Sequence, residues 1–299
     1  MSLHENTLSE LIVRLLRVPL QSYKGGTCTT ATSTTSFKDA ARKEPDDYFQ
    51  STTPVSWIHI ISTTDGAAPV NESAQISDFA NTDGAITYAP ATTAVAVGDK
   101  YVILSEYNMD EIKEAINTAI DIATSNSILT EKIDENLLIQ DDTYEYNIPT
   151  GFTHIYRISQ ANGSGEYPDP IPPSHYKIIR GGAIPRIHFY RFPVEAQHSG
   201  IWYNDLWVST DLDDGKALRI EGFARQPKLE MMGDVCRIDP NFVVWQAAAL
   251  LHGARIIQTA SDFDNNRVRA EYCEGKAREF LADAKKNSQM PPNIKRVAR

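Results

Sequence analysis

Histidine and cysteine side chains are present in the sequence, but their spacing does not suit catalysis or metal binding. The seven histidines are scattered, and none of them form a pair at metal-ligand spacing. His59, His154 and His188 alternate with apolar neighbours in predicted strands, where we expect ordinary cross-strand or surface positions. The three cysteines are far apart and form neither a disulfide framework nor a zinc pattern, as is typical of a reducing compartment.

Three carboxylates lie close together in the segment TDLDDGK, which contains Asp211, Asp213 and Asp214, and the acid pairs Asp46-Asp47 and Asp141-Asp142 are expected to be turn residues. The segment resembles a calcium loop but lacks the bidentate glutamate at its end, so a solvated hairpin turn is the favoured interpretation. The chain also lacks the phosphate-binding, dinucleotide-binding, zinc-protease and nucleophile-elbow motifs. The sequence therefore predicts no catalytic, cofactor-binding or metal-binding residues, and favours a protein that is not an enzyme.

Aromatic residues are concentrated in one part of the chain. They could form a platform that stacks on sugars or bases, or they could be core and cross-strand residues of a sheet, which is the simpler interpretation. The cluster consists of Tyr144, Tyr146, Phe152, Tyr156, Tyr167, Tyr176, Phe189, Tyr190, Phe192, Trp202, Tyr203 and Trp207.

The overall composition describes a globular chain of 299 residues, with 41% hydrophobic and 23% charged residues. No apolar run approaches the roughly 20 residues of a membrane helix, so no membrane partner is expected. The formal net charge is −10, which argues against nucleic-acid binding through bulk charge.

The C-terminal end has the opposite charge. It could be a free disordered tail, a docking arm for another protein, or a contact to DNA phosphates. Its basic residues, with no acid among them, are Lys285, Lys286, Lys295, Arg296 and Arg299.

The N-terminal third is predicted to be a helix followed by strands. Leucines and an isoleucine at helical spacing predict an amphipathic helix from Asn6 to Arg17, packed on its own body. The Thr-rich run from Thr27 to Ser36 indicates loop or edge strand. Short strands separated by Asp-Gly and Gly-Asp turns then predict a small β-barrel or β-sandwich; they are Val55–Ser62, Ala74–Phe79, Ala85–Tyr88 and Lys100–Leu104.

A single strong helix is predicted in the middle of the chain, over Met109–Ala123. Asn108 and Glu111 have the spacing of a capping box at its start. Its apolar face is a packing surface. The face includes Ile112, Ile116 and Ile120.

The remainder of the chain is predicted to contain strands and then two helices. The strands expected are Tyr144–Ile148, Thr153–Ile158, Tyr176–Ile179, Arg186–Tyr190, Asp205–Val208 and Ala217–Phe223.

The first of the two helices begins at Asp239-Pro240 and is apolar nearly all round from Phe242 to Ile257. This chain or a neighbouring subunit must therefore cover it, and Val244, Trp245 and Leu251 are candidates for core or inter-subunit packing. A last helix runs to about Lys286, and Pro291-Pro292 predicts an extended segment beyond it.

These elements predict an α+β fold with a β-rich N-terminal unit, a central helix, and a C-terminal β part followed by two helices and an extended tail. The expected division is an N-terminal helix at 1–19, a β-rich domain at 20–107, a core at 108–286 and a basic arm at 287–299.

The order of segments resembles the head-to-tail connector, or neck adaptor, proteins of tailed bacteriophages. The Thr-rich run Thr27–Phe49, which ends in PDDYF, is the first of five similar pieces. The others are DGAITYAPATTAVAVGDKYVIL (Asp83–Leu104), MDEIKEAINTAIDIA (Met109–Ala123), DTYEYNIPTGFTHIYRI (Asp142–Ile158) and LRIEGFARQPKLEMMGDVCRIDPNFVVWQAAALLHG (Leu218–Gly253).

The resemblance implies a structural virion protein, made in the bacterial host cytoplasm, that forms a ring at the head–tail junction. Such rings, often of twelve copies, join the portal protein to a downstream tail or neck protein and let DNA pass without specific binding. An acidic body suits such a lumen because it repels phosphate, and the basic arm is then expected to dock on the portal. The alternatives are a virion-associated carbohydrate-binding module that uses the aromatic cluster, or another tail ring such as a terminator or baseplate part.

Overall fold

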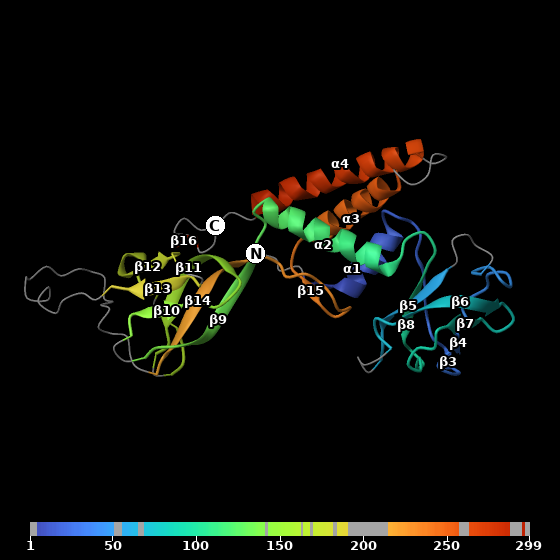
Figure 1. The fold of residues 1–299 in the computed structure, drawn as a ribbon, viewed down its shortest axis with the longest axis horizontal. Coiled ribbons are helices and arrows are strands. Elements are labelled where there is room, and N and C mark those ends of the chain that lie inside the picture. The colour runs from blue at the N-terminus through green and yellow to red at the C-terminus, as the bar shows by residue number, and fades with distance from the viewer. Residues whose placement is uncertain are drawn as a thin grey trace, which may run out of the picture. The chain divides into compact units, whose positions relative to one another are not determined.

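The structure is a computed structural model, and it describes the whole chain except residues 1–4, 51–55, 65–68, 141–142, 163, 168–169, 182–183, 191–214, 257–262, 288–294 and 297–299. Its described residues form an α+β fold, as predicted, with four α-helices and antiparallel sheets (Figure 1). The chain divides into two compact units. Unit 1 comprises Met1–Ile128 and Gln226–Asn287, and unit 2 comprises Leu129–Arg225 and Ser288–Arg299.

This division differs from the expected one. The N-terminal helix and the β-rich segment belong to the same unit as the last two helices, and the segment expected at 108–286 as one core is shared between the two units. Unit 2 is an insertion between the second and third helices, to which the chain returns only with its last residues.

Four helices form the body of unit 1, and the third lies at its centre. It packs against each of the other three, which explains why a sequence that is apolar all round forms a stable helix there. The helices are α1 (Leu8–Arg17), α2 (Met109–Ser125), α3 (Pro240–Arg255) and α4 (Phe263–Asn287).

Local caps fix where these helices begin. The Asn108 side chain accepts a hydrogen bond from the Glu111 backbone N–H at 2.7 Å, and the Glu111 carboxylate accepts one from the Asn108 N–H at 3.0 Å. The predicted capping box is therefore present, and α2 begins at the predicted residue. Asp239 caps α3, with Pro240 at the first helical position.

The β-rich segment of unit 1 is a closed barrel. Its strands follow the order β2-β8-β5-β6-β7-β4-β3, and only Cys28 and Thr29 separate β2 from β3. Residues 24–31 therefore pair first with β8 and then with β4, which joins the two ends of the sheet. The strands are β2 (Lys24–Thr27), β3 (Thr30–Ala31), β4 (Ser36–Lys38), β5 (Trp57–Ser62), β6 (Ser73–Ala80), β7 (Ala85–Ala89) and β8 (Lys100–Leu104).

The barrel has an interior core and an outer face that packs on the helices. Ile58 and Ile60 of β5 point into the interior, whereas Ile61 belongs to the core that the helices form. This alternation is the expected period of a strand that is covered on both faces. The sequence predicted either a β-barrel or a β-sandwich for this segment, and the structure has the barrel.

Unit 2 is an open sandwich of two sheets. The strand orders are β16-β11-β14-β9 and β10-β13-β12, and one apolar core contains residues of both sheets. A short 3₁₀ turn, Pro173–His175, precedes β12. The strands are β9 (Thr130–Leu138), β10 (Glu145–Asn147), β11 (Phe152–Gln160), β12 (Tyr176–Ile179), β13 (Arg186–Phe189), β14 (Ala217–Ala224) and β16 (Lys295–Arg296).

Two strand predictions need comment. The nine-residue strand β9 was not predicted, and the strand predicted at Asp205–Val208 lies outside the described residues. A two-stranded pairing of β1 (Asn6–Thr7) with β15 (Val235–Cys236) ties the start of α1 to the segment before α3.

Candidate interaction surfaces

Polar side chains that could do chemistry are few and separate in the described part of the chain. Across the described ranges, no three His, Cys, Asp or Glu side chains come together to hold a metal ion. The three cysteines are free and buried, and burial raises the pKa of Cys236 and of Cys273 to about 11, which keeps these thiols protonated. Asp211, Asp213 and Asp214 of the expected turn lie outside the described residues.

The barrel contains a buried polar network at its point of closure. The Tyr101 hydroxyl donates to Asp39 Oδ2 at 2.7 Å and accepts from Arg42 Nε at 2.9 Å. Arg42 also donates to the Lys24 carbonyl at 2.8 Å and to Glu44 Oε1 at 2.7 Å. The network links the segment after β4 to β8 and β2, so it holds the barrel closed, and its groups are satisfied by one another.

Glycine is required at one position beside this network. A Cβ on Gly26 of β2 would overlap the Asp39 carboxylate and the Tyr101 hydroxyl. The backbone of β2 therefore approaches the network as closely as it does only because residue 26 has no side chain.

A second polar cluster lies between α2 and α3. The Tyr107 hydroxyl is 3.3 Å from His252 Nδ1, and the Arg255 guanidinium lies 5.1 Å from the Tyr107 ring centre and 3.5 Å from Glu111 Oε2. Burial raises the pKa of Tyr107 to about 12. Tyr107, Glu111 and Arg255 border a small depression of about 260 Å³. The contacts of this cluster connect the start of α2 to the end of α3.

His59 was expected at an ordinary cross-strand or surface position, and it is a buried strand residue. It lies on β5 opposite Val102, on the barrel face that packs against the helices, and is 3% exposed. Neither ring nitrogen has a hydrogen-bond partner. Burial, and secondarily the charge of Lys113, lower its pKa to about 4, so the ring is neutral at pH 7.

The other two strand histidines lie in unit 2, at the positions expected of cross-strand residues. His154 of β11 faces Phe223 of β14. The Nδ1 atom of His188 is 3.2 Å from Glu145 Oε1, across the β10–β13 pair.

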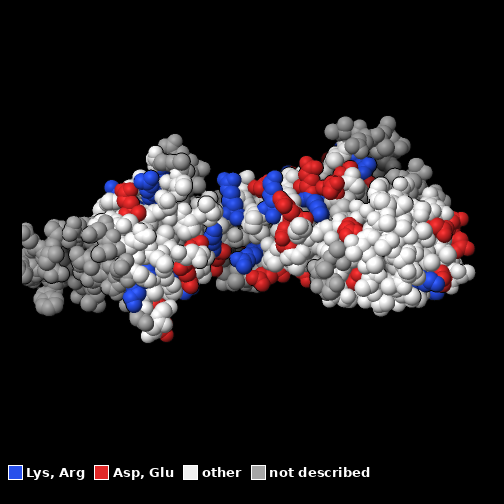
Figure 2. All heavy atoms as spheres, turned by 60° about the horizontal axis from the view of Figure 1, so that its bottom comes forward, with Lys and Arg blue, Asp and Glu red and all other residues white. Residues whose placement is uncertain are grey.

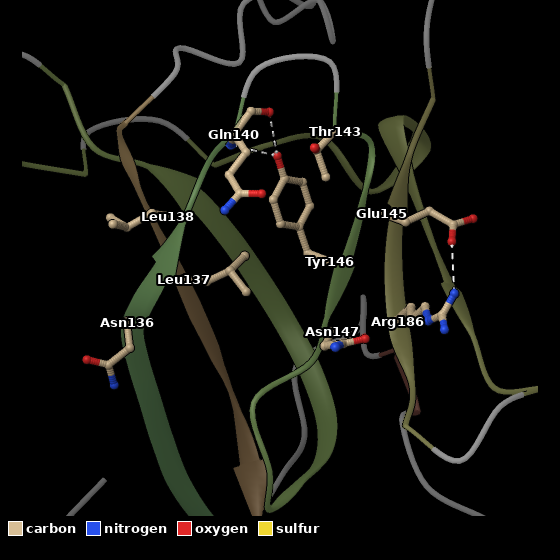
Figure 3. Close-up of a pocket in the computed structure, with 9 residues that line it drawn as sticks. All are labelled: Asn136, Leu137, Leu138, Gln140, Thr143, Glu145, Tyr146, Asn147 and Arg186. Atoms are coloured by element: carbon tan, nitrogen blue, oxygen red, sulfur yellow. Dashed lines mark hydrogen bonds and ion pairs between the residues drawn. The ribbon is translucent and has the colours of Figure 1, made fainter.

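A cavity of about 600 Å³ opens in unit 2 between the edge strands of its two sheets (Figure 3). Tyr146 stands at its centre, and its hydroxyl is bonded to the backbone of Gln140 at 3.1 Å and 3.2 Å. Glu145 and Arg186 form an ion pair of 3.3 Å on one side, while Asn136 and Leu138 point outward on the other. The lining is mixed in character: amides, one ion pair and aliphatic side chains.

The aromatic cluster does not form an exposed platform in the described residues. Several of its rings are buried in the sandwich core and contact each other there, as the simpler interpretation predicted. These core rings are Tyr146, Phe152, Tyr176 and Phe189. Four others, Phe192, Trp202, Tyr203 and Trp207, lie outside the described residues.

The helix residues expected to pack are nearly all enclosed by this chain. α3 packs against α1, α2 and α4 of the same subunit, so no neighbouring subunit is needed to cover these side chains. The buried residues are Ile112, Ile116, Ile120, Val244 and Leu251. Trp245 is only partly buried, and its ring lies 5.9 Å from that of Tyr272, edge to face.

An exposed apolar patch lies next to Trp245. Val268 and Tyr272 stand one turn apart on α4, and both are 59% exposed. We call Trp245, Val268 and Tyr272 the α3–α4 patch. The sequence does not assign the two α4 members to the surface, because their spacing is equally typical of a core face.

The basic arm is divided between a helix end and a strand. Lys285 in the last turn of α4 donates to Asn126 Oδ1 at 2.8 Å, and Lys286 is the next helical residue. Lys295 and Arg296 form β16, which pairs with β11 of the same chain. The arm is thus extended beyond Asn287 where it is described, but it contacts its own subunit. Arg299 lies outside the described residues.

Charge is unevenly distributed over the surface of unit 1. Figure 2 shows mixed groups of both signs over the helices and a broad uncharged area over the barrel. Two barrel segments, residues 25–37 and 84–98, contain no charged residue, and backbone hydrogen bonds from Thr92 to Thr34 and from Tyr88 to Thr35 join them. These two segments are rich in hydroxyl and methyl groups and carry no charged side chain.

The comparisons with known proteins give no family. No protein-family model matches the chain, and no characterised protein matches it significantly. In the described part of the chain, no helix combines the length and apolar character needed to span a membrane.

Proposed function

We propose that the protein is a structural subunit of a ring at the head-to-tail junction of a tailed bacteriophage. In this proposal the ring joins the portal protein to a downstream tail or neck protein, and DNA passes through it. The observation that carries the proposal is the α3–α4 patch, because an apolar helical patch that the described residues of its own chain leave exposed suits contact with another copy.

The chemistry of the described residues supports a structural part. The buried polar groups hold elements together: the Asp39–Tyr101–Arg42 network closes the barrel, and the Tyr107–His252 contact joins α2 to α3. The net charge of −10 suits a passage for DNA, since an acidic wall repels phosphates and does not retain them.

The α3–α4 patch also suits a ring in its composition. Aromatic residues are enriched in protein interfaces, and both Trp245 and Tyr272 present large rings. Around the patch, α4 carries salt bridges between turns, such as Arg267–Glu271 and Arg278–Glu274, so its rim has both charges available for a neighbour. An apolar centre with a charged rim is the usual anatomy of such contacts.

The mass of the purified full-length protein in solution, with particle imaging by electron microscopy, tests the proposal. We expect a closed ring, and co-assembly with the portal protein when the two are mixed. A Val268→Asp variant should stay folded and lose the ring, because it places a charge in the contact.

The chain offers a matched control for that variant. Val97 of the barrel is also 59% exposed but lies outside the patch, so Val97→Asp should keep the ring. A wild-type protein that remains monomeric in the presence of portal protein would contradict the proposal, as would a ring that survives Val268→Asp unchanged.

The cavity of Figure 3 favours a second candidate, a carbohydrate-binding module. Amide side chains such as Gln140 and Asn147 can bond to sugar hydroxyls. Tyr146 presents little ring surface for stacking, since it is 6% exposed. Binding of oligosaccharides by a monomer, lost in Asn147→Leu but not in Val268→Asp, would favour this candidate over the ring.

A further inference from the structure

The strand β11 has one fully paired edge and one edge that is covered only in part. Seven residues of β14 pair with β11 on one side. On the other side, β16 contributes two pairs, His154↔Arg296 and Ile155↔Lys295. The far end of that edge is covered by residues 170–171 through the Ser159↔Pro170 bridge and the bond from Ile171 N–H to the Ile158 carbonyl. The arm therefore fills a short gap that β11 would otherwise leave open.

The pairing between β16 and β11 comprises only two residue pairs. Two residue pairs form only a few backbone hydrogen bonds, and ordering the same residues costs backbone entropy of comparable size. The arm is therefore held at β11 mainly by its tether, that is, by the local concentration that the connecting chain creates.

The tether comes from the other unit. β16 follows α4 of unit 1 after residues 288–294, which include Pro291-Pro292. Because β11 pairs with seven residues of β14 and with only two of β16, β16 can leave one copy of β11 and pair with an identical one while the β11–β14 pairing stays intact. In a ring the neighbouring copy supplies such an acceptor at high local concentration.

Electrostatic attraction favours pairing of the arm with β11, whether β11 belongs to the same chain or to another copy. Residues 288–299 contain three basic residues and no acid, whereas residues 129–225, which form most of unit 2, contain more acids than bases. Attraction between arm and unit 2 is the same whether the two belong to one chain or to two.

We propose that the C-terminal arm is exchanged between subunits: in the assembled ring, β16 of one copy pairs with β11 of the next. This inference rests on the proposed ring and deepens it, since it names a segment that links neighbouring subunits. The exchange replaces an intrachain pairing by an identical one between chains, so it adds no new contact surface and needs no change in unit 2.

Engineered disulfides can distinguish the two arrangements. His154 and Arg296 face each other in the antiparallel register, so a His154→Cys/Arg296→Cys chain can form a bond between the strands. The three natural cysteines are buried and do not compete. We expect the oxidised ring to give a ladder of covalently linked chains on a denaturing gel, and the reduced ring to give one band.

Two controls make the result specific. A Leu138→Cys/Ala217→Cys chain places its pair between β9 and β14, which are both internal to unit 2, and must stay a single band when oxidised. Rings mixed from chains with only His154→Cys and chains with only Arg296→Cys should contain disulfide-linked dimers of the two.

Each outcome decides the proposal. A ring whose double variant gives only intrachain disulfides, or no disulfide at all, overturns the exchange and leaves the ring proposal intact. A protein that forms no ring, although its Leu138→Cys/Ala217→Cys control oxidises normally, overturns both. A ladder in the ring together with intrachain bonds in isolated monomers supports the exchange.

Discussion

In unit 1, the ends of the seven-stranded sheet are joined by residues 24–31, whereas in unit 2 no described strand pairs with the outer edges of β9 and β10. A closed barrel has no edge to offer, so it is complete by itself. An open sandwich exposes backbone donors and acceptors, and one such edge is where the C-terminal arm binds. We therefore expect strand pairing with other chains at the edges of unit 2 and not at the barrel of unit 1.

The largest effect is expected from a charge in the centre of unit 1. Val244→Asp on α3 buries a carboxylate without a partner, which should lower the free energy of unfolding by about 3–5 kcal/mol. Hydrogen exchange, measured on peptides of the protein, should show that the backbone amides of α2 and α3 lose protection and that those of β11 and β14 keep it.

Two results would contradict the expectation that Val244→Asp destabilises unit 1 and leaves unit 2 folded. One is equal loss of protection in both units. The other is a comparable loss of stability in Val268→Asp, whose side chain is exposed and which should change stability by no more than about 0.5 kcal/mol.

Low pH should lower the free energy of unfolding of unit 1, because His59 is buried there as a neutral ring. The unfolded chain takes up a proton near pH 6.5, but the folded chain does so only near pH 4, because burial lowers the pKa of this ring to about 4. The stability that depends on the neutral ring is therefore fully present above pH 6.5 and is lost progressively as the pH falls toward 4. It amounts to roughly 3 kcal/mol, at about 1.4 kcal/mol per pKa unit.

Denaturant unfolding between pH 7 and pH 4 measures this loss. His59→Leu should flatten the pH dependence, because leucine has no proton to take up and removes two unbonded nitrogens. His188→Gln in unit 2 serves as the control and should keep the wild-type slope. An unchanged slope in His59→Leu would show that other groups cause the acid sensitivity.

Removing a hydroxyl should matter more in the barrel than in the sandwich. Tyr101→Phe leaves Asp39 and Arg42 buried without the group that bridges them, and should cost about 1–3 kcal/mol. Tyr146→Phe removes bonds to the Gln140 backbone beside an open cavity that water can enter, and should cost about 1 kcal/mol or less. Thermal unfolding of the two variants compares them, and equal losses would argue against a special role of the network in closing the barrel.

Signals that lie close together in the sequence predicted the helices well. The pair Asn108 and Glu111 placed the start of α2, and Asp239-Pro240 placed the start of α3, because a cap acts within one turn. The short strands β5 to β8 were found from alternation and turns in the same way. The arm was expected to be extended after Asn287, where α4 ends.

Signals that depend on distant partners could not be found in the same way. β9 was missed because Lys132, Asp134 and Glu135 interrupt any alternation, as an edge strand with no fully buried side chain allows. The closure network joins Tyr101 to Arg42 and to Asp39, at sequence separations of 59 and 62 positions. Only the fold brings these residues together. The pairing of β16 with β11 likewise has no local pattern, so the sequence predicted an extended arm but not the strand with which it pairs.

The smallest effect on stability, and the most direct test of the open edge, is expected at Leu138 in unit 2. This residue ends β9 and is 57% exposed, so Leu138→Lys should change the free energy of unfolding by less than about 0.5 kcal/mol. A lysine on an exposed edge hinders pairing with another strand, so the variant should associate less at high concentration. Light scattering over a concentration series measures this.

Val97→Lys provides the matched control, since Val97 is equally exposed in the barrel, where no edge is open. If Val97→Lys lowers association as much as Leu138→Lys, exposed apolar area alone drives it, and the contrast between the closed barrel and the open sandwich has no bearing on association.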